Sequence, residues 1–261
     1  MARTGTTAGG SRAAAAATPA ALAQWALIAA AVAELPPQRL AEPSRLPGWT
    51  VADLVAHCRC CVGALLAALR SGEEPRVGIG IGVDAAGYLL GVGARAEQIA
   101  DTARTDAAAG RGGAELRTDV DALALELPAA DPTRPVPTPG GGMALGEFVL
   151  TRVVEGVVHG LDLGIQPDRG ALRAVVKLFT GMIAAAAPGK SVELRIPPFA
   201  AVQIVAGLRH TRGTPPNVVE VDPVAFVELA AGRLAWADAA ADGRLRASGS
   251  RADLTAYLPL L

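Results

Sequence analysis

The pattern of hydrophobic and polar positions changes its period near residue 166. Before this point, apolar residues recur three and four positions apart over several long stretches, as in amphipathic helices. After it, short runs rich in Val and Ile alternate with polar positions and lie between further helical patterns. The sequence therefore predicts a helical part followed by a part that mixes strands and helices.

The first part contains five helical patterns separated by long connections. Proline, glycine and capping residues mark their ends, and they cover about 19–35, 50–70, 83–109, 114–127 and 144–163. Four of them are main helices, which fits a helix bundle. Residues 1–18 are small, polar or Ala-rich, and we expect them to form a flexible tail.

The second part begins with a helix at about 170–186 and continues with short strand patterns. The strand segments are SVELRIP, AAVQIVAG, NVVEV and RLRASGS, and the helical ones are PVAFVELAAGRL and a terminal RADLTAYLPLL. Strands without a regular βαβ order predict a small α+β domain. The expected fold class is thus α+β, with a helical domain over 19–165 and a smaller α+β domain over 168–261.

Composition limits the kinds of partner. The chain of 261 residues is 51% hydrophobic and 19% charged, so it can build a sizeable core. Its formal net charge is −1 and it has no basic cluster, which argues against binding to nucleic acid or to an anionic membrane. The apolar segment AALAQWALIAAAVAEL is shorter than the roughly 20 residues that span a bilayer, so we expect no membrane insertion. The sequence leaves the oligomeric state open.

The three cysteines lie together in the segment HCRCC, as Cys58, Cys60 and Cys61. Neighbours on one helix do not easily meet disulfide geometry, and three closely spaced cysteines do not form a disulfide framework. A reducing cytoplasm is the simplest setting for such residues.

Candidate metal ligands occur in two of the helical patterns. Glu155 and His159 are four residues apart, so a helix presents both on one face. With His57 they would form a His/His/carboxylate set, which suits Zn²⁺ and leaves a coordination position open. Two other interpretations remain at this point: Glu155 and His159 could lie on a solvated helix face, and His57, among apolar neighbours, could be a buried core histidine.

The same residues carry a resemblance to a known family. The segment LPGWTVADLVAH, followed about a hundred residues later by RVVEGVVHGLDL, resembles the mycothiol-dependent maleylpyruvate isomerase family of DinB-like metal-binding helix bundles. The resemblance covers roughly 19–165 and implies a DinB-like four-helix bundle. It also implies that His57, Glu155 and His159 hold a divalent metal, zinc being our expectation.

The second half resembles the bacterial sterol-carrier-protein-like domain, closely so over about 190–261. This resemblance implies a fold and says little about sterol binding, because a fold does not carry its function with it. Arg209 and Arg212, in the segment RHTRG, are candidate catalytic and cofactor-binding residues, which could hold a carboxylate or the polar groups of a cofactor through bidentate contacts. A solvated turn explains these arginines equally well.

The family resemblance implies an enzyme that uses mycothiol as its thiol cosubstrate. A metal favours the thiolate, and the sulfur would attack a small electrophile in a transfer or an isomerisation. The alternatives are a carrier protein for an apolar ligand and a non-catalytic protein with a structural metal. Neither the substrate nor the identity of the metal can be predicted from the sequence.

Four further residues lie near the predicted ligands in the sequence. Arg152 and Asp162 are candidates for contacts that orient the ligands. Asp53 is more easily explained as a charge at a helix start. Cys61, four residues after His57, could be a fourth ligand that closes the site, but the pattern favours a small core residue.

Overall fold

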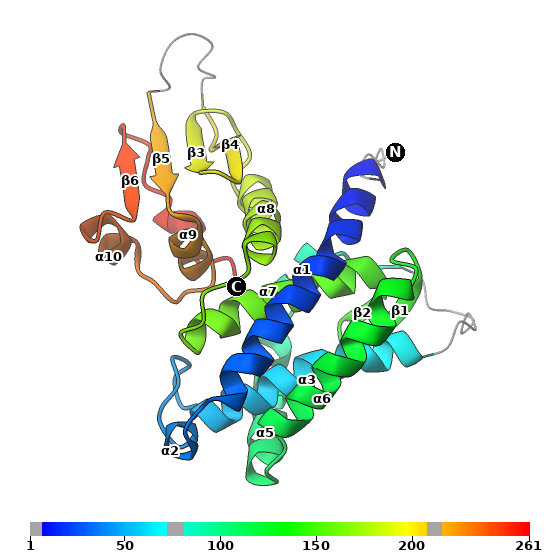
Figure 1. The fold of residues 1–261 in the computed structure, drawn as a ribbon. Helices are drawn as coiled ribbons and strands as arrows, with labels where there is room; N and C mark the ends of the chain where they lie inside the picture. Colours follow the sequence, from blue (N-terminus) through cyan, green and yellow to red (C-terminus); the bar gives the residue numbers. More distant parts are fainter. Residues whose placement is uncertain (1–6, 72–80, 208–215) are drawn as a thin grey trace. The chain divides into compact units, whose positions relative to one another are not determined.

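The computed structural model describes residues 7–71, 81–207 and 216–261. The chain divides into two compact units, Met1–Ala174 and Val175–Leu261. The first is helical apart from a short hairpin, and the second combines helices with a four-stranded sheet (Figure 1). The predicted α+β class is therefore confirmed.

The first unit holds most of the helices. Its helical elements are α1 (Thr7–Ala33), α2 (Pro37–Leu40), α3 (Val51–Arg70), α4 (Ala85–Leu90), η1 (Gly93–Arg95), α5 (Ala96–Ala108), α6 (Gly113–Glu126), η2 (Leu127–Ala129) and α7 (Leu145–Asp162). An antiparallel hairpin of β1 (Pro135–Thr138) and β2 (Gly141–Ala144) leads into α7. Helix α8 (Arg169–Ala186) begins in this unit and continues into the next.

A bundle of α1, α3, α6 and α7, with α5 alongside, forms the body of this unit. Helix α1 packs against α6 and α7, while α3 packs against α5, α6 and α7. Large side chains from three of the helices are fully buried between them: Trp25, Leu54, Leu65 and Phe148. Burying them accounts for about 1.5–3 kcal/mol each, so packing rather than helix propensity holds the bundle together.

Helix α3 begins as its sequence predicts. Thr50 and Asp53 form a capping box, in which Thr50 Oγ1 accepts from the Asp53 backbone N–H at 3.2 Å and Asp53 Oδ2 accepts from the Thr50 backbone N–H at 2.8 Å. By length and composition alone α3 could cross a membrane, but 61% of its apolar window is buried inside the protein. Its apolar character therefore has the ordinary explanation of a core helix.

Several elements differ from the sequence-based expectations. Helix α1 starts at Thr7 instead of near Pro19, because the Ala-rich run has high helix propensity and continues through Pro19. The single helix expected over 83–109 breaks between Gly91 and Gly93 into α4, η1 and α5. Neither the hairpin nor the short α2 and α10 (Trp236–Ala241) was expected. The expected terminal helix shrinks to the turn η3 (Thr255–Tyr257), ahead of a proline.

The second unit contains a sheet with strand order β4-β3-β5-β6. Its strands are β3 (Val192–Ile196), β4 (Ala200–Ile204), β5 (Val218–Val221) and β6 (Leu245–Ser248). Strand β3 runs antiparallel to β4 and parallel to β5, and β5 runs antiparallel to β6. Alternate residues of β3 and β5 are buried, as are apolar residues of α8 and of α9 (Pro223–Ala230). These four elements supply much of the core of the unit.

Candidate metal centre

The three predicted ligands come together at the contact of α3 with α7. These helices pack against each other within the bundle (Figure 1). Oε2 of Glu155 lies 3.4 Å from Nε2 of His57 and 3.0 Å from Nε2 of His159. The two imidazole rings meet edge to face, with centroids 4.8 Å apart. Residues 98 positions apart in the chain thus converge on one carboxylate oxygen.

The polar stripe of α7 is not a solvated helix face. Arg152, His159 and Asp162 are each less than 8% exposed, and the side chain of Glu155 is 15% exposed. The alternative of an amphipathic surface helix is therefore excluded for this side of α7. Charged and polar groups buried in this way need specific partners, since unpaired burial of a charge is very costly.

The charges of the cluster shift the pKa values of its members in opposite directions. Burial raises the pKa of the Glu155 carboxyl, but hydrogen bonds from His159 and His57 and the charge of Arg152 outweigh it and hold the pKa well below its usual range. Burial lowers the pKa of His57, but Cys61 and Glu155 outweigh this and raise it to about 10. Without a metal, the cluster thus pairs an anionic Glu155 with a protonated His57, and a metal would take the place of that proton.

A second carboxylate orients His159. Oδ2 of Asp162 lies 3.1 Å from Nδ1 of His159, and the Asp162 side chain is fully buried. With a proton on Nδ1 donating to this carboxylate, the neutral ring presents its Nε2 lone pair to a metal, whereas without a metal a second proton on Nε2 donates to Glu155. Metal-bound histidines typically have such a carboxylate partner.

Two of the separations between donor atoms fit the edges of a tetrahedral metal site. Metal–nitrogen and metal–oxygen distances of about 2.0–2.2 Å place two ligand atoms about 3.4 Å apart in a tetrahedron. The separations of 3.4 Å and 3.0 Å between the carboxylate oxygen of Glu155 and the two Nε2 atoms are close to this value. The donors are also chemically suitable, because Zn²⁺ prefers imidazole nitrogen, thiolate sulfur and carboxylate oxygen.

Arg152 supports the other oxygen of Glu155. Its Nη2 lies 3.6 Å from Glu155 Oε1, and its guanidinium stacks over the ring of Phe148 at 4.9 Å. The ring of Tyr88 lies on the same guanidinium at 5.5 Å. A buried cation held in this way keeps the carboxylate in place and leaves Oε2 to the histidines.

The structure shows the contacts of two nearby residues whose roles the sequence did not decide. Asp53 contacts Thr50 in the capping box, which supports its interpretation as a helix-start charge. Cys61 is buried, as expected of a core residue, but its Sγ lies 3.5 Å from Nε2 of His57.

Sequence reasoning missed Trp49, whose ring meets the His57 ring edge to face at a centroid distance of 5.7 Å. Its place in the motif LPGWT, one residue before the Thr50 cap, was the available signal.

The arginines that we predicted as catalytic or cofactor-binding, Arg209 and Arg212, lie outside the described residues. Their role stays a prediction from the sequence.

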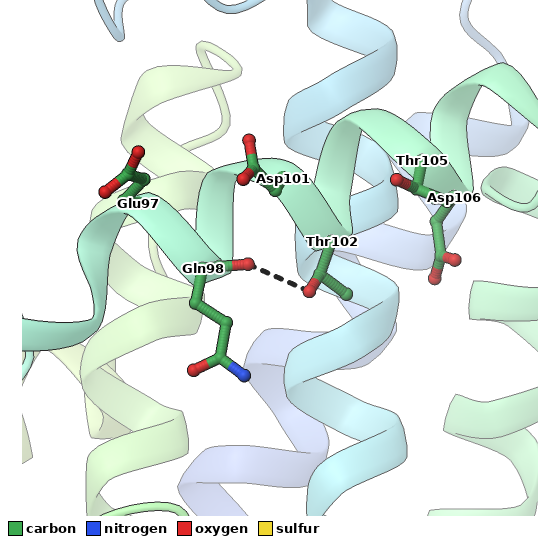
Figure 2. Close-up of a pocket in the computed structure, with 6 residues that line it drawn as sticks. All are labelled: Glu97, Gln98, Asp101, Thr102, Thr105 and Asp106. Carbon is green, nitrogen blue, oxygen red and sulfur yellow. Dashed lines mark hydrogen bonds between the residues drawn. The ribbon is translucent and has the colours of Figure 1, made fainter.

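An open pocket lies elsewhere in the same unit, along α5. Figure 2 shows its lining by polar residues of that one helix, among them Glu97, Asp101 and Asp106. Asp106 is already engaged by Arg59 and Arg111. None of the candidate metal ligands lines this pocket, so it is separate from the site described above.

The fold and the cluster define a class of protein: a helix bundle with a buried His–Glu–His cluster, followed by a small α+β domain. Residues 21–164 match the family described as mycothiol maleylpyruvate isomerase N-terminal domain. Residues 168–260 match the family described as bacterial SCP ortholog. The first match covers more than half of the chain. The chain therefore belongs to the mycothiol maleylpyruvate isomerase family, which is a family of enzymes, and both predicted resemblances are confirmed.

Solved structures agree with this assignment at the level of the fold. A crystal structure of the mycothiol-dependent maleylpyruvate isomerase is 20% identical in sequence, with a TM-score of 0.54. The similarity covers 94% of this chain and 93% of that one. A histidine-to-alanine mutant of that enzyme is similar to the same extent, with a TM-score of 0.53. No curated protein matches the sequence.

Proposed function

We propose that this protein is a divalent-metal enzyme, with zinc as the favoured metal, that uses mycothiol to transfer sulfur to, or to isomerise, a small electrophilic substrate. The observation that carries the proposal is the convergence of His57 and His159 on one oxygen of Glu155 in a buried site. Membership of an enzyme family described by its use of mycothiol supports the same conclusion.

His57, Glu155 and His159 would hold the metal. Bound there, the metal would favour the thiolate form of a thiol that is mostly protonated at neutral pH. The substrate class that suits a thiolate is an activated alkene, an epoxide or a halide. In an alkene, addition followed by elimination isomerises the double bond, whereas the other two undergo net transfer.

The remaining residues of the cluster orient the ligands and exclude water. Asp162 accepts the Nδ1 proton of His159 and so fixes which ring nitrogen faces the site. Arg152 holds Oε1 of Glu155, and its stacking on Phe148 keeps the guanidinium from turning away. Trp49 covers one edge of His57. We expect this preorganisation to matter more for the reaction than any single contact.

We also propose a reducing compartment, such as the cytoplasm, as the location of the protein. All three cysteines are free, and Cys58 and Cys61 are buried. Free thiols persist where glutathione-like or mycothiol-like reductants keep them reduced.

The test is an incubation of the zinc-loaded protein with mycothiol and a panel of electrophiles that includes maleylpyruvate, followed by mass spectrometry of the products. We expect an isomerised product or a sulfur adduct that requires both protein and thiol. Glu155→Gln should abolish the product and reduce metal content. Glu147→Gln is the matched control on the same helix, because Glu147 accepts from the Ala85 backbone N–H and belongs to no part of the cluster.

The outcomes separate the candidate functions. Full zinc occupancy without any product or adduct would refute the enzymatic proposal and favour a carrier of an apolar ligand. Unchanged metal content in Glu155→Gln would refute the assignment of the site, even if the parent protein were active.

A further inference from the structure

Cys61 is the residue of the cluster that the proposed ligand set does not use. It lies one helical turn after His57 on α3 and is 2% exposed. Its Sγ is 3.5 Å from Nε2 of His57, and the ligand atoms of His57, Cys61 and Glu155 all lie within 4.8 Å of one another. His159 adjoins this group through Glu155, with its Nε2 3.0 Å from Oε2. A sulfur therefore lies beside the nitrogen of His57 and the oxygen of Glu155.

The separations around His57 fit a shared ion. In a tetrahedral zinc site, metal–sulfur distances of about 2.3 Å and metal–nitrogen distances of about 2.0 Å place sulfur about 3.6 Å from nitrogen. Nε2 of His57 lies 3.5 Å from Cys61 Sγ and 3.4 Å from Glu155 Oε2. Both separations match the edges of one coordination tetrahedron.

Hydrogen bonds alone explain this geometry less well. Nε2 of His57 carries at most one proton, and it faces both Cys61 Sγ and Glu155 Oε2. Oε2 of Glu155 in turn faces the Nε2 atoms of both histidines. One proton on His57 can serve only one of its two neighbours well, whereas one cation between His57, Cys61 and Glu155 would serve both contacts of this nitrogen.

We infer that Cys61 is a fourth protein ligand, so that His57, Cys61, Glu155 and His159 close the coordination of the resting metal. The inference rests on the metal site of the proposed function and deepens it. If the fourth position is taken by the protein, an external thiol reaches the metal only by displacing Cys61 or by adding as a fifth donor. Cys61 then competes directly with the thiol cosubstrate.

Cobalt substitution tests the inference without any turnover. The parent protein is freed of metal and loaded with Co²⁺ alone, with a phosphine reductant so that no external thiol is present. We expect a sulfur-to-cobalt charge-transfer band in the near ultraviolet, which histidine and carboxylate ligands do not give. Cys61→Ser should lose this band while still binding Co²⁺. Cys60→Ser is the matched control and should keep it, because the Cys60 thiol donates to Asp106 at 3.3 Å, outside the cluster.

X-ray absorption of the zinc-loaded parent provides a measurement that needs no variant. One sulfur at about 2.3 Å from the metal is expected. An absorption spectrum with only nitrogen and oxygen neighbours would overturn the inference, as would a charge-transfer band that persists in Cys61→Ser. Either result, at full metal occupancy, leaves the proposed function intact. A parent protein that binds no metal would overturn both, and elemental analysis distinguishes the two cases.

Discussion

The hydrogen bond between Asp162 and His159 gives the sharpest test of the metal centre. In Asp162→Asn the side chain keeps its shape but loses its charge, and its amide can present an N–H to Nδ1 where the carboxylate accepted a proton. His159 would then be free to carry its proton on Nε2, the atom that faces Glu155. Because Asp162 touches the ring of His159 and not the proposed metal position, the change probes ligand orientation and leaves the ligand set intact.

The structure sets the size of the expected effect. Loss of a carboxylate partner of a metal-bound histidine typically weakens metal affinity by about 10- to 100-fold. The Asp162 side chain is fully buried and the contact measures 3.1 Å, so water cannot replace the lost acceptor. We therefore expect zinc binding to weaken by about 30-fold, or about 2 kcal/mol.

Competition for Zn²⁺ against a chromophoric chelator at neutral pH measures this affinity. Asp53→Asn is the matched control, because Asp53 lies one turn before His57 on α3 but contacts the Thr50 cap. It should lower the free energy of unfolding by about 1 kcal/mol and leave the zinc affinity unchanged. An Asp162→Asn protein that is folded by circular dichroism and binds zinc within about twofold of the parent would refute the role of Asp162.

Three further predictions concern stability. Gly160→Ala should destabilise the fold by about 1–2 kcal/mol in urea unfolding, because the added Cβ would lie 2.9 Å from the buried amide of Gln24. Gly181→Ala is the control: a Cβ added there has no neighbour within 4 Å, so the change should be neutral or stabilising. Arg111 holds the pKa of the Asp106 carboxyl below its usual range, so the ion pair stabilises the folded state above about pH 4 and is lost as pH falls through the lowered pKa. Asp106→Asn should therefore lower the free energy of unfolding by about 2 kcal/mol at pH 7, and this difference from the parent should shrink below pH 4. An equal loss of stability at both pH values would contradict this reasoning. Removal of metal by a chelator should lower the melting temperature, since zinc at about 100 times its Kd contributes about 2.7 kcal/mol; identical melting curves would argue against a metal bound to the folded state.

Local signals in the sequence predict the two helices that carry the site. The capping box at Thr50 and the apolar spacing give α3, and the spacing of apolar residues over 144–163 gives α7 within a residue or two at each end. Where local signals conflict, the prediction fails. The segment PVPT pairs as an edge strand with GGMA, although proline and glycine normally disfavour strands.

The meeting of α3 and α7 could not be predicted from spacing. The sequence places Glu155 and His159 on one helix face, but a periodic pattern does not say which helix packs on that face. Burial of the stripe and its contact with His57 depend on the packing of the bundle, which only the family resemblance anticipated. Another contact of α7 depends on its glycines: Gly156 and Gly160 let α1 approach closely, with Gln24 donating to the Gly156 carbonyl at 3.0 Å.

The position of Cys61 shows why ligand number and function are linked in this site. Counted from the sequence motifs, the protein supplies three donors, which is the number typical of a catalytic zinc site with one open position. Counted from the geometry, a fourth donor lies 3.5 Å from Nε2 of His57, and four protein donors are typical of structural zinc sites. A cysteine sulfur that is close enough to bind the metal, on the same helix as His57, reconciles the two counts if a competing thiol displaces it. Under the proposed function, the affinity of the metal for Cys61 relative to mycothiol would then determine whether the site reacts or only stabilises the bundle.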